Sequence, residues 1–330
     1  MQILNDPSNA LTEMRDGITW AHPQLMAVPA THGFIDRAFV DTTVPVFAGG
    51  GSGHDPAHWG YVGTGMLTGA IMGDFFMPPT AKEIIKVVHA ATKQHRAFFI
   101  VKNFVQDVTQ FTAARDELRQ AGWHVGMAIV RDDVSVAGTD FQQRRRGVAG
   151  TVLVHKIIGA AAAQGMSVDK LQRLADQLLP EIKTIGFSSS GAVIPGHSNP
   201  SFKLPENTIS YGVGIHGEPG YHEEPFQSSE MLAHELVNKL QINFHWRADD
   251  HFAVLVDSLG GTTAMETLVF ANDVRQLLSL AGVHVDFAKV GTFLSSNGMH
   301  GLSLSLLHLV DPSWLQLLQA PVQTPSWPQA

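Results

Sequence analysis

The chain has 330 residues, of which 44% are hydrophobic and 16% are charged, and its formal net charge is −8. This length is too great for one ordinary domain and suits two packed α/β domains, and the composition is that of a folded chain. The acidic balance argues against direct binding of nucleic acid, and the absence of cysteine excludes disulfides, thiolate metal sites and cysteine nucleophiles.

Targeting and membrane signals are not apparent in the sequence. The segment Met1–Asn9 carries Asp6 and lacks the apolar core of a signal peptide. No apolar run approaches the roughly 20 residues that a membrane-spanning helix needs. We therefore expect a cytoplasmic protein without a membrane segment.

The first half of the chain alternates short apolar runs with helical patterns. The runs expected to form buried strands are Val44–Ala48, Ala97–Val101 and Val125–Val130. The expected helices are Ala81–Gln94, Phe111–Ala121 (ended by Gly122), Val148–Gln164 and Val168–Ile182. This alternation favours a parallel sheet with helices on its faces.

A second set of elements follows. The expected strands are Thr184–Ser188, Thr208–Val213, Phe252–Val256, His284–Ala288 and Leu302–Leu309, with helices at Ser229–Leu240 and Ala264–Ala281. The segment Ser190–Pro205 is predicted to be a loop, and the tail Pro321–Ala330 to be extended. The sequence thus predicts an α/β fold of two domains, 1–183 and 184–330, with largely parallel sheets.

A glycine-rich segment directly follows the first predicted strand. Gly49 to Gly53 holds four glycines in five residues, and His54 comes next. Glycines let the backbone approach a ligand closely and point amides toward it. The spacing fits neither a Walker phosphate loop nor the Rossmann fingerprint. A plain structural turn remains an alternative, but the adjacent histidine favours a binding site.

The second predicted strand ends in the polar segment Lys102 to Asp107. Asp107 could act as a general base or contact a ligand, and Lys102 and Asn103 offer hydrogen-bond donors. An acid after a strand is often only a helix cap, so this alternative stays open.

The segment Gly212 to Gly220 places His216 among glycines, with Glu218 two residues on. A neutral imidazole is a competent nucleophile for a carbonyl group, and little bulk around it would obstruct a small ligand. Glu218 could orient the ring or raise its basicity. The alternative is a histidine that only satisfies a hydrogen bond of the turn.

A metal site is also conceivable from the histidines. His54 and His58 have i, i+4 spacing, but Pro56 between them argues against a zinc-binding helix. A second candidate set is His216, His222, Glu223 and Glu224. With 17 histidines in the chain such proximity arises easily, and we expect no metal.

Taken together, these segments resemble the DhaK family of dihydroxyacetone kinases over nearly the whole chain. The matching motifs include Asn5–Pro7, Gly49–Pro56, Gly65–Ala70, Lys102–Phe104, Asp132–Val134, Arg145–Thr151, Gly212–Gly220, Leu259–Thr262 and Ala320–Val322. The string Gly-Ile-His-Gly-Glu-Pro-Gly around His216 is the most specific of them.

The resemblance implies a mechanism and a small pocket. The histidine matching His216 attacks the ketone carbon of dihydroxyacetone to form a hemiaminal, and that matching His54 hydrogen-bonds a substrate hydroxyl. The residue matching Asp107 accepts the proton of the hydroxyl to be phosphorylated. The residues implied to line the pocket are Gly51, Ser52, Gly53 and Lys102.

The resemblance also implies the assembly. Family members of this length are two-domain α/β homodimers and bind no nucleotide, so the chain would not be active alone. ATP, ADP or a phosphoprotein donor would belong to DhaL-type and DhaM-type partner subunits.

Three departures from the kinase pattern suggest a second hypothesis for the function. Kinase members usually have Tyr-Thr-Gly where this chain has Phe104-Val105-Gln106, an acid near Asn297, and Asn near Asp257. The chain is thus similar to DhaQ, a paralogue that binds dihydroxyacetone and coactivates a transcription regulator called DhaS. We expect a ligand-sensing coactivator, with the substrate-binding subunit of a kinase as the alternative.

Overall fold

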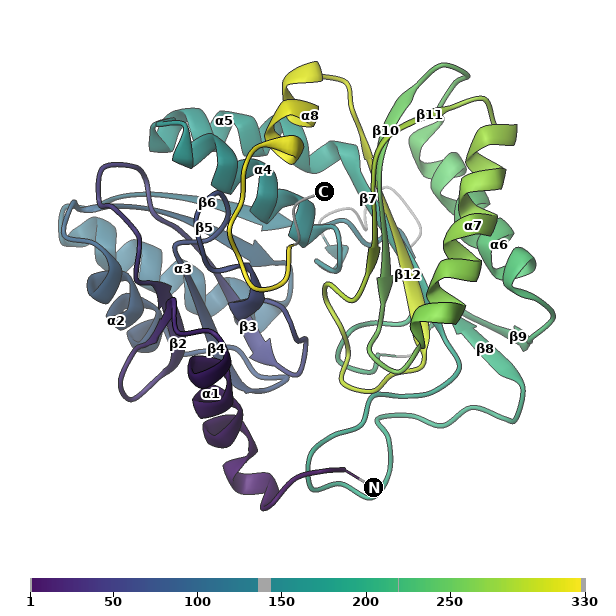
Figure 1. Cartoon of the computed structure of the whole chain (residues 1–330), viewed down its shortest axis with the longest axis horizontal. Helices are drawn as coiled ribbons and strands as arrows, with labels where there is room; N and C mark the ends of the chain where they lie inside the picture. The colour runs from purple at the N-terminus through teal and green to yellow at the C-terminus, as the bar shows by residue number, and fades with distance from the viewer. Residues whose placement is uncertain (1, 136–143, 219, 328–330) are drawn as a thin grey trace.

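Two six-stranded sheets, each covered by helices, lie side by side in the computed structural model, which describes residues 2–135, 144–218 and 220–327 (Figure 1). The first sheet has the strand order β1-β2-β4-β3-β5-β6 and the second β11-β10-β12-β7-β8-β9. An α/β fold with two sheets is therefore confirmed.

The strands of the first sheet are β1 (Leu25–Ala27), β2 (His32–Asp36), β3 (Val46–Ser52), β4 (Gly69–Phe75), β5 (Arg96–Lys102) and β6 (His124–Val130). Those of the second are β7 (Ile182–Ser188), β8 (Thr208–Tyr211), β9 (His222–Pro225), β10 (His251–Ser258), β11 (His284–Gly291) and β12 (Gly301–His308). The α-helices are α1 (Ala10–Ala21), α2 (Ala81–Ala91), α3 (Val105–Gln120), α4 (Thr151–Ala163), α5 (Val168–Leu178), α6 (Ser229–Phe244), α7 (Ala264–Leu280) and α8 (Pro312–Gln319). The short 3-10 helices are η1 (Pro7–Asn9), η2 (Trp59–Tyr61) and η4 (Leu179–Glu181).

The first sheet is buried on both faces, which explains its continuous apolar strands. Strands β4, β3, β5 and β6 are parallel, as the β-α-β alternation predicted. In β5, Phe98 belongs to the core under α4 and α5, whereas Phe99 belongs to the core under α2 and α3. Successive side chains point to opposite faces of a strand, so a fully buried strand must be apolar at every position.

The second sheet corrects the expectation of largely parallel sheets. Only β10 and β11 pair in parallel, and the other four pairs of this sheet are antiparallel. The cause lies in the connections between strands. Helix α7 carries the chain across from β10 to β11, but among the described residues no helix joins β11 to β12 or β8 to β9. Helices α6 and α7 cover one face of this sheet.

The bounds of some elements also differ from those expected. Helix α3 begins at Val105 instead of Phe111, because the chain is extended at Phe104 (φ −116°, ψ 142°) and turns helical directly after it. Asp107 therefore lies in the first turn of a helix. Strands β1, β2, β4 and β9 were not anticipated.

The end of the chain returns to the first sheet's helices. After β12, helix α8 packs on α4, and the buried Lys156 donates a hydrogen bond to the carbonyl of Leu317 (2.7 Å). Further on, the amide of Gln323 donates to the carbonyl of Thr64. The division at residue 183 remains a prediction. Of the tail Pro321–Ala330 that was expected to be extended, 321–327 forms no helix and bridges to Thr64 at Gln323, and 328–330 lie outside the described residues. None of the helices described is long and apolar enough to cross a lipid bilayer.

Candidate functional site

The glycine-rich segment and the segment after β5 meet at one edge of the first sheet. Strands β3 and β5 are parallel neighbours, so their carboxyl ends lie together. A Cβ added to Gly50 would lie 2.4 Å from Lys102 Nζ and 2.8 Å from Asp107 Oδ1. Only glycine leaves room for these two groups, and two of the three predicted segments are thus brought into contact.

Lys102 is fully buried at this edge. Its Nζ lies 2.8 Å from Nε2 of the buried His58 and 3.4 Å from the carbonyl oxygen of Gly49. Burial lowers the pKa of Lys102, and the charge of Asp107 acts against this shift. His58 was considered only as a metal ligand from the sequence, and here it holds the lysine.

Asp107 is only 3% exposed, and its Oδ1 has no hydrogen-bond partner within the described part of the chain. Burial raises the pKa of Asp107, while the charges of Lys102 and His216 act in the opposite direction. A carboxylate with a raised pKa and a free oxygen is a better proton acceptor than one at the surface. This arrangement suits a general base.

His54 is completely buried beside them. Its Nδ1 lies 2.9 Å from the carbonyl oxygen of Ser295, which can only accept, so Nδ1 carries the proton. Burial, followed by the charges of His216 and Lys102, holds the pKa of His54 well below its usual range. The ring is therefore neutral, with Nε2 as a free acceptor that has no partner among the described residues.

His216 approaches this group from a loop beside the second sheet. Its ring centre lies 4.8 Å from that of His54 and 4.4 Å from that of Phe104, in edge-on contacts. Phe76 stacks on His54 at 5.1 Å and also contacts His216. No motif in the sequence pointed to Phe76, whereas Phe104 was noticed as part of the matching motif Lys102–Phe104 and as a departure from the tyrosine of the kinase pattern.

Glu218 orients His216. One carboxylate oxygen accepts the amide of His216 (2.9 Å), and the other lies 3.5 Å from Nδ1 of its ring. Burial would raise the pKa of Glu218, but the hydrogen bond and charge of His216 and the charge of Arg146 lower it to about 2. An ionised Glu218 favours a proton on Nδ1 and leaves the lone pair on Nε2 of His216.

Arg146 holds the His216 loop in place. It donates to a carboxylate oxygen of Asp133 at 2.7 Å and to the carbonyl of Gly212 at 2.8 Å. Pro219 of the same motif lies outside the described residues. The loop that carries His216 is thereby tied to the segment that follows β6.

The remaining predicted pocket residues have visible structural roles. Ser52 donates its hydroxyl to the carbonyl of Gly73 (2.7 Å), so this side chain supports the fold. Gly53 has φ +96°, and its carbonyl accepts the amide of Asn297. A Cβ on Gly51 would overlap the backbone of Phe76. Ligand contacts by Gly51, Ser52 and Gly53 remain predictions.

The described residues contain no group of three or more histidines and carboxylates arranged to hold a metal ion. His54 and His58 have separate partners, and His222 lies 3.6 Å from Glu224 near the surface. The chemistry of the site therefore comes from the two imidazoles, the ammonium group and the carboxylate. Together they suit a small carbonyl compound that also carries hydroxyl groups.

The comparisons with known proteins agree on one family. The model of the Dak1 domain matches residues 16–326. The chain is 44% identical to the DhaKLM operon coactivator DhaQ of Lactococcus lactis, covering 99% of this chain and all of the relative. It is 42% identical to the dihydroxyacetone-binding subunit DhaK of the PTS-dependent kinase of the same organism, covering 99% and 98%.

Solved structures give the same result. The dihydroxyacetone kinase operon co-activator DhaQ superposes with a TM-score of 0.92 at 44% identity, covering 96% of this chain and 98% of that one. The dihydroxyacetone kinase of C. freundii superposes with a TM-score of 0.90 at 30% identity, covering all of this chain but 60% of that chain.

Proposed function

This chain belongs to the Dak1 domain family, and from that premise we propose that it binds dihydroxyacetone covalently and acts as a ligand-sensing coactivator of a dihydroxyacetone kinase operon. The observation that carries the proposal is the meeting of His216 with His54 and Asp107, from opposite sheets. The similarity to the coactivator DhaQ over the full length supports it.

The proposed capture is an addition to the ketone. Nε2 of His216 forms a bond to the carbonyl carbon and the π pair of the carbonyl moves to oxygen. That oxygen takes up a proton from water, and the ring releases its Nδ1 proton in exchange, so the hemiaminal is neutral overall. The charge that develops on the ring is stabilised by Glu218, toward which the Nδ1 proton can leave. His54 Nε2 and Asp107 would accept hydrogen bonds from the two hydroxyl groups. Glycerol lacks a carbonyl group and would not be captured.

Two departures from the kinase pattern support the coactivator role. Val105, two residues before Asp107, is 85% exposed, and kinases usually carry a polar threonine at this position. The side chain of Asn297, near the position of the usual acid, donates to the carbonyl of Val193. Both changes lie close to the site without removing its histidines. They alter the surface next to the ligand site, which a nucleotide-bearing subunit would have to contact.

The partner we propose is a DhaS-like transcription regulator, bound by a homodimer of this chain in the cytoplasm. The chain itself would contact no nucleic acid, in keeping with its net charge of −8. The buried carboxylate of Asp107, with a raised pKa and a free oxygen, favours one alternative, the substrate-binding subunit of a kinase with DhaL-type and DhaM-type partners. In that case the nucleotide or phosphoprotein donor would be on those partners.

One pair of assays separates the two roles. The protein is loaded with dihydroxyacetone and mixed either with the regulator of its own organism or with the DhaL-type and donor proteins. We expect ligand-dependent binding of the regulator and no rapid formation of dihydroxyacetone phosphate. Rapid phosphorylation that depends on His216, without regulator binding, would make the chain the kinase subunit.

A further inference from the structure

A groove of about 570 Å³ lies apart from the histidine site, between the start of β8 and helices α6 and α7. Its walls are mainly apolar and include Phe187, Leu204 and Phe270. Polar residues, among them Ser189, Glu206 and Glu266, also line it. None of the residues that we assign to ligand capture lines this groove.

The rim of the groove exposes large apolar side chains. Met265 is 74% exposed, Val269 51% and Phe226 48%. On α7, Met265, Leu268 and Val269 follow the i, i+3, i+4 spacing of one helix face, and Leu268 is 60% exposed. A contiguous exposed apolar face beside a groove is typical of a protein interaction site.

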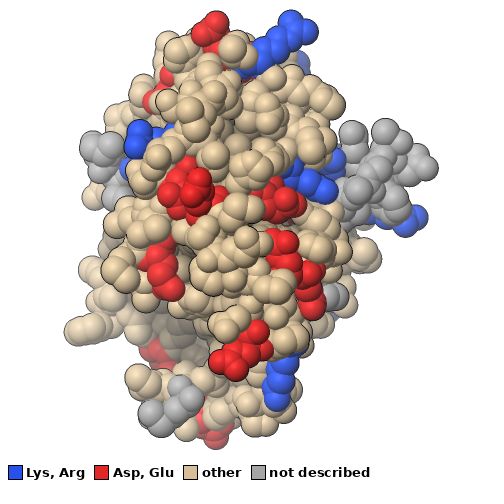
Figure 2. All heavy atoms as spheres, turned by 90° about the vertical axis from the view of Figure 1, so that its right-hand side faces the viewer, with Lys and Arg blue, Asp and Glu red and all other residues tan. Residues whose placement is uncertain are grey.

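The charge of this face indicates the kind of partner. Glu206 and Glu266 line the groove, and Glu230 lies in the first turn of α6 beside it. Figure 2 shows acidic side chains across the middle of this side of the molecule, with basic ones mainly at its margins. An apolar groove with an acidic border complements a helix that has one apolar face and a basic flank.

A short segment links the histidine site to this groove. At its start, the carbonyl of Ser295 fixes Nδ1 of His54, and the hydroxyl of Ser296 donates to the carbonyl of Ile215 (2.6 Å), next to His216. The segment 295–300 therefore touches the loops of both histidines. Any shift of these loops on ligand capture acts directly on this segment.

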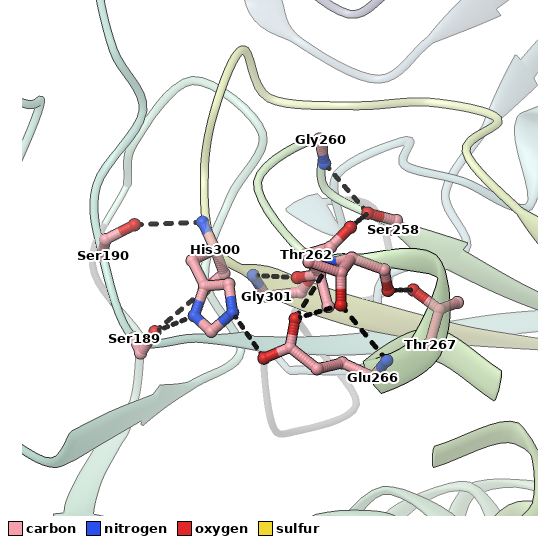
Figure 3. Close-up of polar contacts among 10 residues, drawn as sticks. Ser189, Ser190, Ser258, Gly260, Thr262, Glu266, Thr267, His300 and Gly301 are labelled. Carbon is pink, nitrogen blue, oxygen red and sulfur yellow. Dashed lines mark hydrogen bonds and ion pairs between the residues drawn. The ribbon is translucent and has the colours of Figure 1, made fainter. Parts of the chain in front are cut away.

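At its other end, the segment reaches the groove through His300 (Figure 3). Nδ1 of His300 lies 2.6 Å from the hydroxyl of Ser189, and Nε2 lies 3.2 Å from a carboxylate oxygen of Glu266. The other carboxylate oxygen of Glu266 accepts the amide and hydroxyl of Thr263, which caps α7. His300 thus ties the start of α7 to the end of β7.

We propose that this groove is the docking site for the regulator, which would insert an amphipathic helix with an apolar face and a basic flank. The proposal rests on the coactivator function and names the surface through which it acts. Captured ligand would change the groove through the segment 295–300. A ligand alters partner binding only if the partner's affinity differs between the loaded and the free protein.

The docking site is tested by substitutions that place a charged side chain in the groove. Calorimetric binding of the same regulator to dihydroxyacetone-loaded protein is measured for Val269→Asp and for the control Leu280→Asp. Leu280 is 84% exposed on the same helix and does not line the groove. We expect a loss of at least about 30-fold for Val269→Asp, because a buried charge opposes an apolar contact, and no change for the control. Both variants should keep the adduct and the thermal unfolding of the wild type.

The link is tested with His300→Ala, with and without dihydroxyacetone. We expect the variant to bind the regulator, but its affinity for the regulator should be about the same with and without dihydroxyacetone. A dependence on dihydroxyacetone equal to that of the wild type would overturn the proposed link.

The possible failures are distinguishable. If the loaded wild type does not bind the regulator at all, the coactivator function fails and the docking site with it. If the wild type binds and Val269→Asp binds equally well, only the docking site is wrong. If Val269→Asp instead changes the oligomeric state and leaves regulator binding intact, the groove is an interface between two copies of the chain.

Discussion

Asp107 and His216 sit in one pocket but have separable tasks. The covalent bond needs a nucleophilic nitrogen, whereas Asp107 offers only a proton acceptor with a raised pKa. We therefore predict that Asp107→Asn still forms the adduct, with affinity reduced no more than about tenfold, the order of one hydrogen bond. Titration of the adduct by native mass spectrometry measures this. A complete loss of the adduct would mean that Asp107 takes part in capture.

Asp257 is another fully buried carboxyl group with a raised pKa. It accepts the amides of Phe293 and Leu294 at the base of the segment that reaches His54. Burial raises the pKa of Asp257 to about 8 from its usual 3.8. Because the unfolded chain ionises this group at lower pH, its contribution to stability falls as the pH rises from about 4 to about 8.

The variant Asp257→Asn should remove this pH dependence. The amide can still accept both backbone hydrogen bonds but never ionises, so the variant should be more stable than the wild type at pH 8, by up to about 5 kcal/mol. Thermal unfolding at pH 5 and pH 8 measures the gap in stability between the variant and the wild type, and the exposed Asp16→Asn serves as control. A gap that does not widen at pH 8 would contradict the assignment.

At the scale of elements, the glycine-rich end of β3 sets the size of the pocket. A methyl group at Gly50 would overlap Lys102 Nζ and Asp107 Oδ1. We predict that Gly50→Ala is somewhat destabilised by the positive φ of this position (+155°) but folds, because the overlapping side-chain ends can move, and that it loses at least about tenfold in dihydroxyacetone affinity. The matched control is Gly122→Ala, where a Cβ meets no atom within 4 Å. Equal losses in both variants would mean that Gly50 does not border the ligand.

Elements with strong local signals could be predicted from the sequence. Strands β3, β5 and β6 are apolar runs that end in glycine or polar residues, and the structure has all three. The start of α3 was missed because no side chain caps its first turn, and that turn carries an exposed Val105 followed by the polar Gln106 and Asp107. Strand β4 was missed because Gly69 at its start and Gly73 within it resemble a turn.

At the scale of the whole molecule, the sequence is less informative because pairing between distant segments leaves no local pattern. The antiparallel return of β12 between β10 and β7 depends on such pairing. The same holds for the contact between His54 and His216, which are 162 positions apart. Their joint role could be expected only from the family resemblance. Phe76 and Ser295 join the site through tertiary contacts, and no motif pointed to them. His58 was weighed from the sequence only as a metal ligand, and its contact with Lys102 is likewise tertiary.

The central claim is that His216 holds dihydroxyacetone through a covalent bond. The most direct measurement is ¹³C NMR of the protein mixed with dihydroxyacetone labelled at the carbonyl carbon. For the wild type and for the control His222→Ala, we predict a protein-bound tetrahedral carbon, distinct from the free ketone and its hydrate. For His216→Ala we predict that this signal is absent while the unfolding temperature stays unchanged. A bound tetrahedral carbon that persists in His216→Ala would contradict the account.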